Sequence, residues 1–212
     1  MLQRAAVLEY VAIVSASACF AFGCSSKQDA AKKDDTVYRQ APVTAVASDP
    51  MGNCGAVLRS YRGATATHRP ACSTIEYATS PPIFGDHYPI WGAYKTYDFP
   101  VPLGYLVHDL EHGAVDIFYD CPDGCSDEVA TVQSFIDALP ADPRCASDVR
   151  VQVVLVPRPG LGARWAASAW GYSVTADCFD PDIFSQFYAD HHGRGPEDLC
   201  LQGQDFSADP CL

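Results

Sequence analysis

The chain has 212 residues, of which 48% are hydrophobic and 19% charged, so it can form one or at most two domains with a buried core. Acidic residues outnumber basic ones by 26 to 14, and the formal net charge is −12. Because nucleic-acid affinity depends on cations that neutralise phosphates, this acidic chain without a basic block is not expected to bind nucleic acid.

The N-terminus is typical of an export signal. Within residues 1–23, Arg4 precedes an apolar stretch that finishes in small residues. The end of this stretch, Ala21 to Cys24, resembles a bacterial lipobox, in which the cysteine is acylated and becomes the first residue. We therefore expect lipidation at Cys24 and an exported protein held at the membrane of the bacterial cell envelope, in the periplasm or at the outer membrane. The alternatives are cleavage before Cys19 and an uncleaved membrane anchor.

A polar segment follows the signal. Residues 24–51 are small, polar and charged without apolar periodicity, so they are predicted to form a flexible tether. A single globular domain is then expected over 52–212. Its first half, to about Pro102, is rich in loops and aromatic residues.

The second half has a more regular pattern. β-Branched and apolar runs predict strands, and apolar residues on one helical face predict helices. The expected elements are a strand at 114–119, a helix at 126–139, a strand at 149–156, a strand at about 164–174 and a helix at 180–192. This order favours an α+β fold with a small, largely antiparallel sheet and two helices packed on one face.

The chain has ten cysteines. If Cys19 leaves with the signal and Cys24 carries lipid, an even number remains, which fits a disulfide framework in an oxidising compartment. The candidates are Cys54, Cys72, Cys121, Cys125, Cys145, Cys178, Cys200 and Cys211. Short-range pairings are the simplest guesses, namely Cys54–Cys72, Cys121–Cys125 and Cys200–Cys211. A thiolate metal or redox site is the alternative, although the sequence contains no C-x-x-C motif.

Histidines supply the most informative pattern. If the segment from Val107 to Gly113 is helical, His108 and His112 lie one turn apart on one face, with Glu111 beside them. Two imidazoles at this spacing can bind one cation. His87 and His68, in loops upstream, are further candidate ligands, and imidazoles with a carboxylate suit a divalent transition metal such as zinc or copper.

The same residues allow other interpretations. The string matches the H-x-x-E-H pattern of inverted zinc peptidases, in which Glu111 would be the catalytic general base of a metal-dependent hydrolase. The histidines could equally be incidental on a short surface helix. A third hypothesis is a non-catalytic envelope module that binds a protein or glycan partner through an aromatic surface of Tyr88, Trp91 and Tyr94.

Three motifs together resemble a known family. They are P-P-x-x-G-x-H-Y-P from Pro81, W-G-x-Y from Trp91, and V-H-x-L-E-H-G from Val107, ahead of a strand. This combination resembles the bacterial domain-of-unknown-function family 3105, as do Ala169-Trp170-Gly171 and the segment from Gly193 to Glu197. The resemblance implies roles for His87, His108, Glu111 and His112, with His68 upstream, but no reaction, because the activity of the family is not established.

Overall fold

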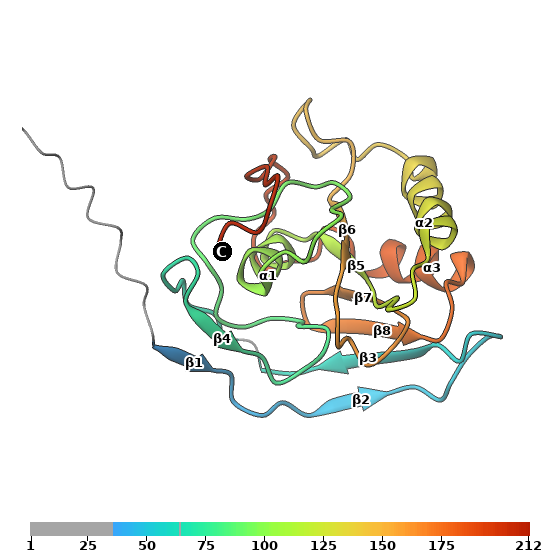
Figure 1. The fold of residues 1–212 in the computed structure, drawn as a ribbon, viewed down its shortest axis with the longest axis horizontal. Coiled ribbons are helices and arrows are strands. Elements are labelled where there is room, and N and C mark those ends of the chain that lie inside the picture. Colours follow the sequence, from blue (N-terminus) through green and yellow to red (C-terminus); the bar gives the residue numbers. More distant parts are fainter. Residues whose placement is uncertain (1–35, 64) are drawn as a thin grey trace, which may run out of the picture. The chain divides into compact units, whose positions relative to one another are not determined.

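The computed structural model describes residues 36–63 and 65–212. The predicted signal, Cys24 and the first part of the predicted tether therefore lie outside the described residues. The described strands are β1 (Val37–Arg39), β2 (Ala45–Ala47), β3 (Val57–Tyr61), β4 (Thr74–Glu76), β5 (Val115–Tyr119), β6 (Val153–Pro157), β7 (Trp165–Ala169) and β8 (Tyr172–Ala176). The helices are α1 (Leu103–Glu111), α2 (Ser126–Ala138) and α3 (Pro181–His191) (Figure 1).

One sheet organises the fold. Its strand order is β2-β3-β8-β7-β5-β6, and every neighbouring pair is antiparallel except β5 and β6. Parallel neighbours need a crossover connection, and α2 supplies it between β5 and β6. A separate parallel pair joins β1 to β4. The α+β class and the largely antiparallel sheet expected from the sequence are confirmed.

Both faces of the sheet are covered. Val115 and Ile117 of β5 pack in the cluster that contains Phe184 and Phe187 of α3 and residues of α2, whereas Phe118 packs with α1. This alternation follows from the period-2 geometry of a strand. Figure 1 shows α1 on one side of the strands and α2 with α3 on the other. The two helices expected on one face are α2 and α3, and α1 is an additional helix on the opposite face.

The predicted strand at 164–174 is in fact a hairpin. β7 and β8 are antiparallel neighbours, and Gly171 between them has a φ of +82°. The tight reversal needs this left-handed conformation, which glycine adopts without a steric penalty. An apolar run that continues through such a two-residue turn is easily mistaken for one long strand.

The predicted tether also extended too far. β1 and β2 lie within residues 36–51, where β1 pairs with β4 and β2 pairs with β3. Short edge strands rich in alanine and polar residues lack the apolar periodicity that identifies a strand, so the sequence did not indicate them. The structured part therefore begins before the predicted boundary at 52.

All eight candidate cysteines form disulfides. The pairs are Cys54–Cys178, Cys72–Cys211, Cys121–Cys125 and Cys145–Cys200. Among the guessed pairings, Cys121–Cys125 is confirmed, whereas those of Cys54 with Cys72 and of Cys200 with Cys211 are wrong. Cys54 precedes β3 and Cys178 follows β8, and the antiparallel pairing of these strands brings the two together.

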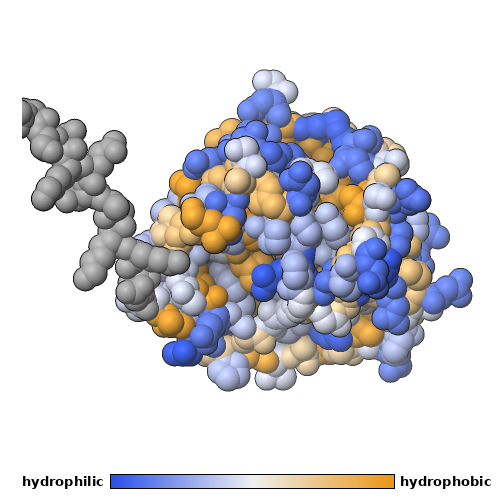
Figure 2. All heavy atoms as spheres, in the orientation of Figure 1, coloured by the Kyte–Doolittle hydropathy of each residue, from blue (hydrophilic) through white to orange (hydrophobic). Residues whose placement is uncertain are grey.

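Four disulfides are typical of a protein outside the cytoplasm, in an oxidising compartment. Over residues 36–63 and 65–212, no helix has the length and apolar character needed to cross a membrane. On the face seen in Figure 2, hydrophilic residues cover much of the described surface and hydrophobic ones are scattered among them.

Candidate metal centre

Helix α1 carries the central part of the site. It begins after Pro102, buries Leu106 and Leu110, and ends at Glu111. Gly113 then adopts a φ of +91° and turns the chain into β5. A side chain at Gly113 would lie 2.9 Å from the backbone of Gly193, so the turn also allows close approach of the segment after α3. Helix α1 is short because β5 begins only a few residues after it ends.

His108 and His112 lie side by side at the end of α1. Their Nε2 atoms are 3.2 Å apart and both side chains are buried, with exposed fractions of 4% and 2%. The i,i+4 spacing places both imidazoles on one helical face. The surface helix with incidental histidines is therefore wrong, because these rings lie in the interior.

Two loops bring His68 and His87 to the helix. Their backbones form a β-bridge, in which the amide of Arg69 donates to the carbonyl of His87 at 2.7 Å. The ring of His87 lies 4.8 Å from that of His68 and 4.7 Å from that of His108. The carboxylate of Asp86, next to His87 in the chain, pairs with Arg69 at 2.5 Å.

Four ligand atoms converge at this point. One from each of His68, His87, His108 and Glu111, here called the ligand cluster, lies within 4.8 Å of the others. Within the ligand cluster, Nε2 of His87 lies 2.9 Å from Oε2 of Glu111. His68 is exposed, Glu111 is partly buried, and the other two are buried. The ligand cluster is thus reachable from solvent on one side.

Backbone carbonyls fix the ring orientations. Nδ1 of His87 contacts the carbonyl of Gly85 at 2.8 Å, and Nδ1 of His108 contacts the carbonyl of Tyr88 at 2.6 Å. A carbonyl only accepts hydrogen bonds, so each Nδ1 carries the proton and each Nε2 presents a lone pair to the cluster. Metal-binding histidines in proteins are held in this way.

Burial also sets the charge of the site. Desolvation lowers the pKa of His87, and it lowers the pKa of His108 to about 4. Both rings are therefore neutral at ordinary pH. Burial and the nearby carboxylate of Glu197 raise the pKa of Glu111. A neutral imidazole beside a partly buried carboxylate lacks the positive charge that a stable ion pair needs.

Glu197 is a site residue that the sequence reasoning missed. Its Oε2 lies 3.3 Å from Nε2 of His112, and its backbone amide donates to the carbonyl of Glu111 at 3.0 Å. The segment Gly193-Arg194-Gly195-Pro196-Glu197, noted only for its family resemblance, was the signal that could have found it. Gly195 in this segment packs directly on the backbone of Glu111, where no side chain would fit.

The aromatic residues do not form an exposed surface. Tyr88 and Tyr94 are buried, with exposed fractions of 5% and 9%. Trp91 is half-buried, its ring lies 4.5 Å from that of His112, and its Nε1 donates to the carbonyl of Leu201. The predicted exposed surface of Tyr88, Trp91 and Tyr94 is therefore not formed, and Trp91 forms a wall of the histidine site.

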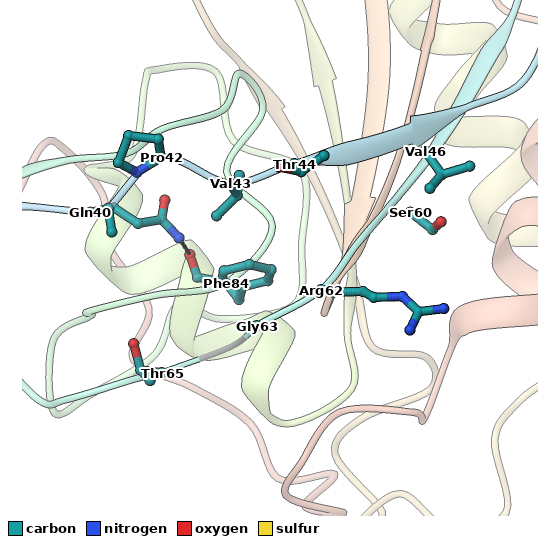
Figure 3. A pocket seen from close by; sticks show the side chains of 11 residues that line it. Gln40, Pro42, Val43, Thr44, Val46, Ser60, Arg62, Gly63, Thr65 and Phe84 are labelled. Atoms are coloured by element: carbon teal, nitrogen blue, oxygen red, sulfur yellow. Dashed lines mark hydrogen bonds between the residues drawn. The ribbon is translucent and has the colours of Figure 1, made fainter.

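A pocket of about 470 Å³ lies elsewhere. It is lined by residues of β2, β3 and neighbouring loops, including Val46, Arg62 and Phe84 (Figure 3). No member of the ligand cluster is among the described residues that line it.

The ligand cluster offers three imidazoles and a carboxylate, a donor set that zinc and copper favour.

Comparison with known proteins identifies a family but not a function. The model of the family "Protein of unknown function (DUF3105)" matches residues 68–202, which contain the complete ligand cluster and Glu197. Searches of curated proteins and of solved structures find no match to the chain.

Proposed function

The chain belongs to the DUF3105 family, and we propose that it is a metal-binding protein whose ligand cluster holds a divalent transition-metal ion, zinc or copper. The observation that carries this proposal is the convergence of four ligand atoms within 4.8 Å. Ligands of one ion at metal–ligand distances of about 2.0–2.2 Å lie roughly 3–4 Å apart, so small side-chain shifts suffice for binding.

An ordinary ion pair explains the site less well. The lowered pKa of His87 and the raised pKa of Glu111 both disfavour the charged forms of an ion pair. Moreover, Nε2 of His87 is buried, and its 2.9 Å contact with Oε2 of Glu111 lacks hydrogen-bond alignment, so the atom makes no hydrogen bond within the described residues. A cation at this position satisfies the lone pairs and the carboxylate together.

The proposal includes an extracytoplasmic location. The disulfides fit an oxidising compartment, and the sequence of residues 1–24 resembles a lipoprotein signal with Cys24 as the lipid-bearing residue. We therefore propose an exported metal-binding protein held at the cell envelope by an N-terminal lipid. Cells that express the wild-type protein or Cys24→Ser are grown with a radiolabelled fatty acid. We expect label in the wild-type protein and none in Cys24→Ser, and equal labelling of the two proteins would contradict the lipid anchor.

The position of Glu111 bears on the hydrolase alternative. Its carboxylate is one of the four converging donors and lies 2.9 Å from Nε2 of His87. This placement favours Glu111 as a metal ligand over a general base, which acts on a bound water from outside the ligand set. Metal binding is accordingly the function that the geometry supports best.

Metal analysis of protein purified without a polyhistidine tag tests the proposal. We expect at least one zinc or copper ion per chain, and a loss of affinity of at least about tenfold in His87→Ala or His108→Ala, because second-shell changes alone cost that much. His191→Ala is the matched control, since His191 stacks on Tyr172 at the end of α3, outside the ligand cluster. Stoichiometry near zero after loading with zinc or copper would overturn the proposal.

A further inference from the structure

Two further donors stand beside the ligand cluster without belonging to it. Nε2 of His112 lies 3.2 Å from Nε2 of His108 and 3.3 Å from Oε2 of Glu197. These are the separations expected between neighbouring ligands of one tetrahedral ion. The rings of His68 and His112 both contact His108 but have different other neighbours. The ring of His68 also contacts His87, whereas that of His112 also contacts Trp91.

His108 can serve only one ion. Its Nδ1 is engaged with the carbonyl of Tyr88 at 2.6 Å, so only its Nε2 is available as a ligand. If His108 binds an ion together with His112 and Glu197, then His68, His87 and Glu111 remain as a second set. Each set then contains two imidazoles and one carboxylate, a combination that holds divalent transition metals with positions left open.

We propose that the site is dinuclear, with one ion held by His68, His87 and Glu111 and a second by His108, His112 and Glu197. This inference rests on the proposed function, because it keeps an ion in the ligand cluster but assigns His108 to a second ion beside it. The juxtaposition of Nε2 atoms supports it. Nε2 of His108 presents a lone pair to Nε2 of His112. A proton on Nε2 of His112 can be donated either to His108 or to Glu197, whereas an ion can be bound by His108, His112 and Glu197 at once.

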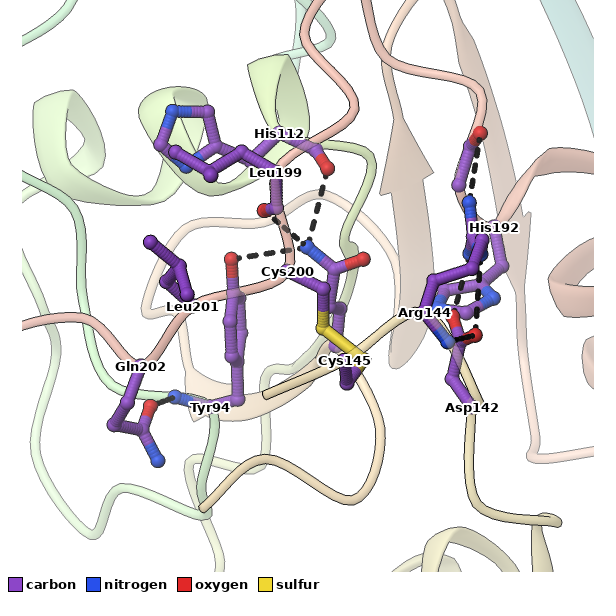
Figure 4. Close-up of a disulfide and its surroundings, with 12 residues drawn as sticks. Tyr94, His112, Asp142, Arg144, Cys145, His192, Leu199, Cys200, Leu201 and Gln202 are labelled. Atoms are coloured by element: carbon purple, nitrogen blue, oxygen red, sulfur yellow. Dashed lines mark hydrogen bonds and ion pairs between the residues drawn. A yellow bond between two sulfur atoms is a disulfide. The ribbon is translucent and has the colours of Figure 1, made fainter. Parts of the chain in front are cut away.

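The segment that carries Glu197 is firmly attached on both sides. The amide of Gly193 donates to the carbonyl of Gly113 at 2.7 Å, and Arg144 pairs with Asp198 at 3.1 Å. Further along, Cys200 is joined to Cys145 (Figure 4). The backbone at Glu197 is therefore held in place over α1, and its 58% exposed side chain reaches His112 from there.

Gln152 connects this segment to the helix. Its Nε2 donates to the carbonyl of His112 at 3.1 Å and to that of Leu199 at 3.0 Å. Figure 4 shows His112 and Leu199 meeting at this amide. The second set of ligands is thus built from two segments that are fixed relative to each other, which reduces the entropy lost when an ion binds.

A dinuclear site defines a chemical class of ligand. Each ion would keep open coordination positions because only three protein ligands serve it, and a pair of ions close enough to share a ligand would take a bridging water or a small oxyanion. The exposed side chains of His68 and Glu197 border the site, so small ligands can reach it.

The stoichiometry of the loaded protein tests the inference. Metal-free full-length protein is incubated with Zn²⁺ or Cu²⁺, dialysed and analysed for metal and protein content. We expect two ions per chain, and about one in His112→Ala and in Glu197→Gln. The second of these variants changes an exposed side chain and avoids the risk of misfolding that a buried substitution carries. The double variant His68→Ala/His87→Ala is also expected to retain about one ion.

Electron paramagnetic resonance of the copper-loaded protein gives an independent readout. Two coupled Cu²⁺ ions are expected to give a signal much weaker than the copper content, and Glu197→Gln restores the full signal of an isolated ion. One ion in the wild-type chain, or two ions retained in both His112→Ala and Glu197→Gln, overturns the dinuclear site and leaves the proposed function intact. No bound ion in the wild-type chain overturns both.

Discussion

The hydrogen bond from Nδ1 of His108 to the carbonyl of Tyr88 determines much of the chemistry of the site. It selects the tautomer, aims Nε2 at the neighbouring donors and limits His108 to a single ion. The same arrangement at His87 uses the carbonyl of Gly85. The carbonyl oxygens of Tyr88 and Gly85 thus orient the rings of His108 and His87, and no charged side chain is needed for this.

The pH dependence of metal binding follows from burial. Desolvation lowers the pKa of His108 and of His112 to about 4, so both rings keep their lone pairs at pH values where an ordinary histidine is protonated. We expect the ion held by His108, His112 and Glu197 to remain bound at pH 5 and to be released as the pH approaches 4. Equilibrium dialysis against a metal indicator from pH 7 to pH 3.5 measures this, and a release midpoint near pH 6.5 would contradict it.

A buried pair of carboxyl groups lies between α1 and the sheet. Asp109 of α1 and Asp116 of β5 are both completely buried. The amide of Gly92 lies beside the carboxyl group of Asp109, whereas the oxygens of Asp116 have no hydrogen-bond partner within the described residues. Burial raises the pKa of both groups well above 3.8, and their mutual repulsion adds to the rise for Asp109. The folded protein therefore binds protons that the unfolded chain releases.

Asp116→Asn tests this linkage. With raised pKa values in the folded state, the wild-type protein loses stability as the pH rises above 3.8, because unfolding frees the carboxyl groups to ionise. The variant has one such group fewer and no repulsion. Between pH 5 and pH 8 the free energy of unfolding of Asp116→Asn should therefore decrease less than that of the wild-type protein. Denaturant unfolding at each pH measures this difference. Asp98→Asn, at an exposed position, is the control, and equal slopes in both variants would contradict the argument.

Some site residues were predictable from the sequence and others were not. The spacing of His108 and His112 needs only helical geometry, which is a local property. Glu197 lies about ninety residues further along the chain and meets His112 only because the segment after α3 returns over α1. No periodicity in the sequence encodes this contact, so spacing alone could not reveal it.

At the scale of elements, helix α1 is held by close packing on one loop. A side chain at Gly104 would lie 2.7 Å from the ring of Tyr88, and the amide of Tyr88 donates to the carbonyl of Gly104. Because the carbonyl of Tyr88 also orients His108, this glycine connects the position of the helix to that of a ligand.

Gly104→Ala therefore has two opposing effects. Alanine stabilises an exposed helical position by about 1 kcal/mol relative to glycine. Here the added methyl group displaces a buried tyrosine ring, and overpacking of this kind costs about 1–3 kcal/mol. We expect a net loss of thermal stability together with weaker metal binding. Ser134→Ala, on the exposed face of α2, serves as the control and should leave metal binding unchanged.

The elements of the second half were predictable because their patterns are strong. The strand at β5 and the helices α2 and α3 are found within one or two residues of the expected positions. Asp180 caps α3, since its side chain accepts from the amides of Asp182 and Ile183. The short strands β1, β2 and β4 were missed because three residues are too few to show a period.

At the scale of the whole molecule, the disulfides differ greatly in the length of chain that they enclose. Cys72–Cys211 joins residues 139 positions apart, whereas Cys121–Cys125 joins residues four positions apart. In the chain-entropy account, the stabilisation grows with the logarithm of loop length. The long-range bond therefore restricts the unfolded chain far more.

Removing each pair by serine substitution tests this ranking. Cys72→Ser/Cys211→Ser should lower the free energy of unfolding by about 3 kcal/mol more than Cys121→Ser/Cys125→Ser, as measured in urea. Equal losses would show that local strain or denatured-state structure dominates instead. The presence of a disulfide framework followed from the number of cysteines, but the pairing depended on strand order and could not be deduced from the sequence.

The ligands of the proposed centre come from four separate parts of the chain: the loop at His68, the loop at His87, the end of α1, and the segment at Glu197. Before folding, only the short stretch from His108 to His112 brings donors near one another. We therefore expect a definite sequence of maturation, in which the cysteines pair and the sheet closes before metal is acquired. A nascent chain would then hold no metal ion, and the ion would be bound in the compartment where the protein finally resides.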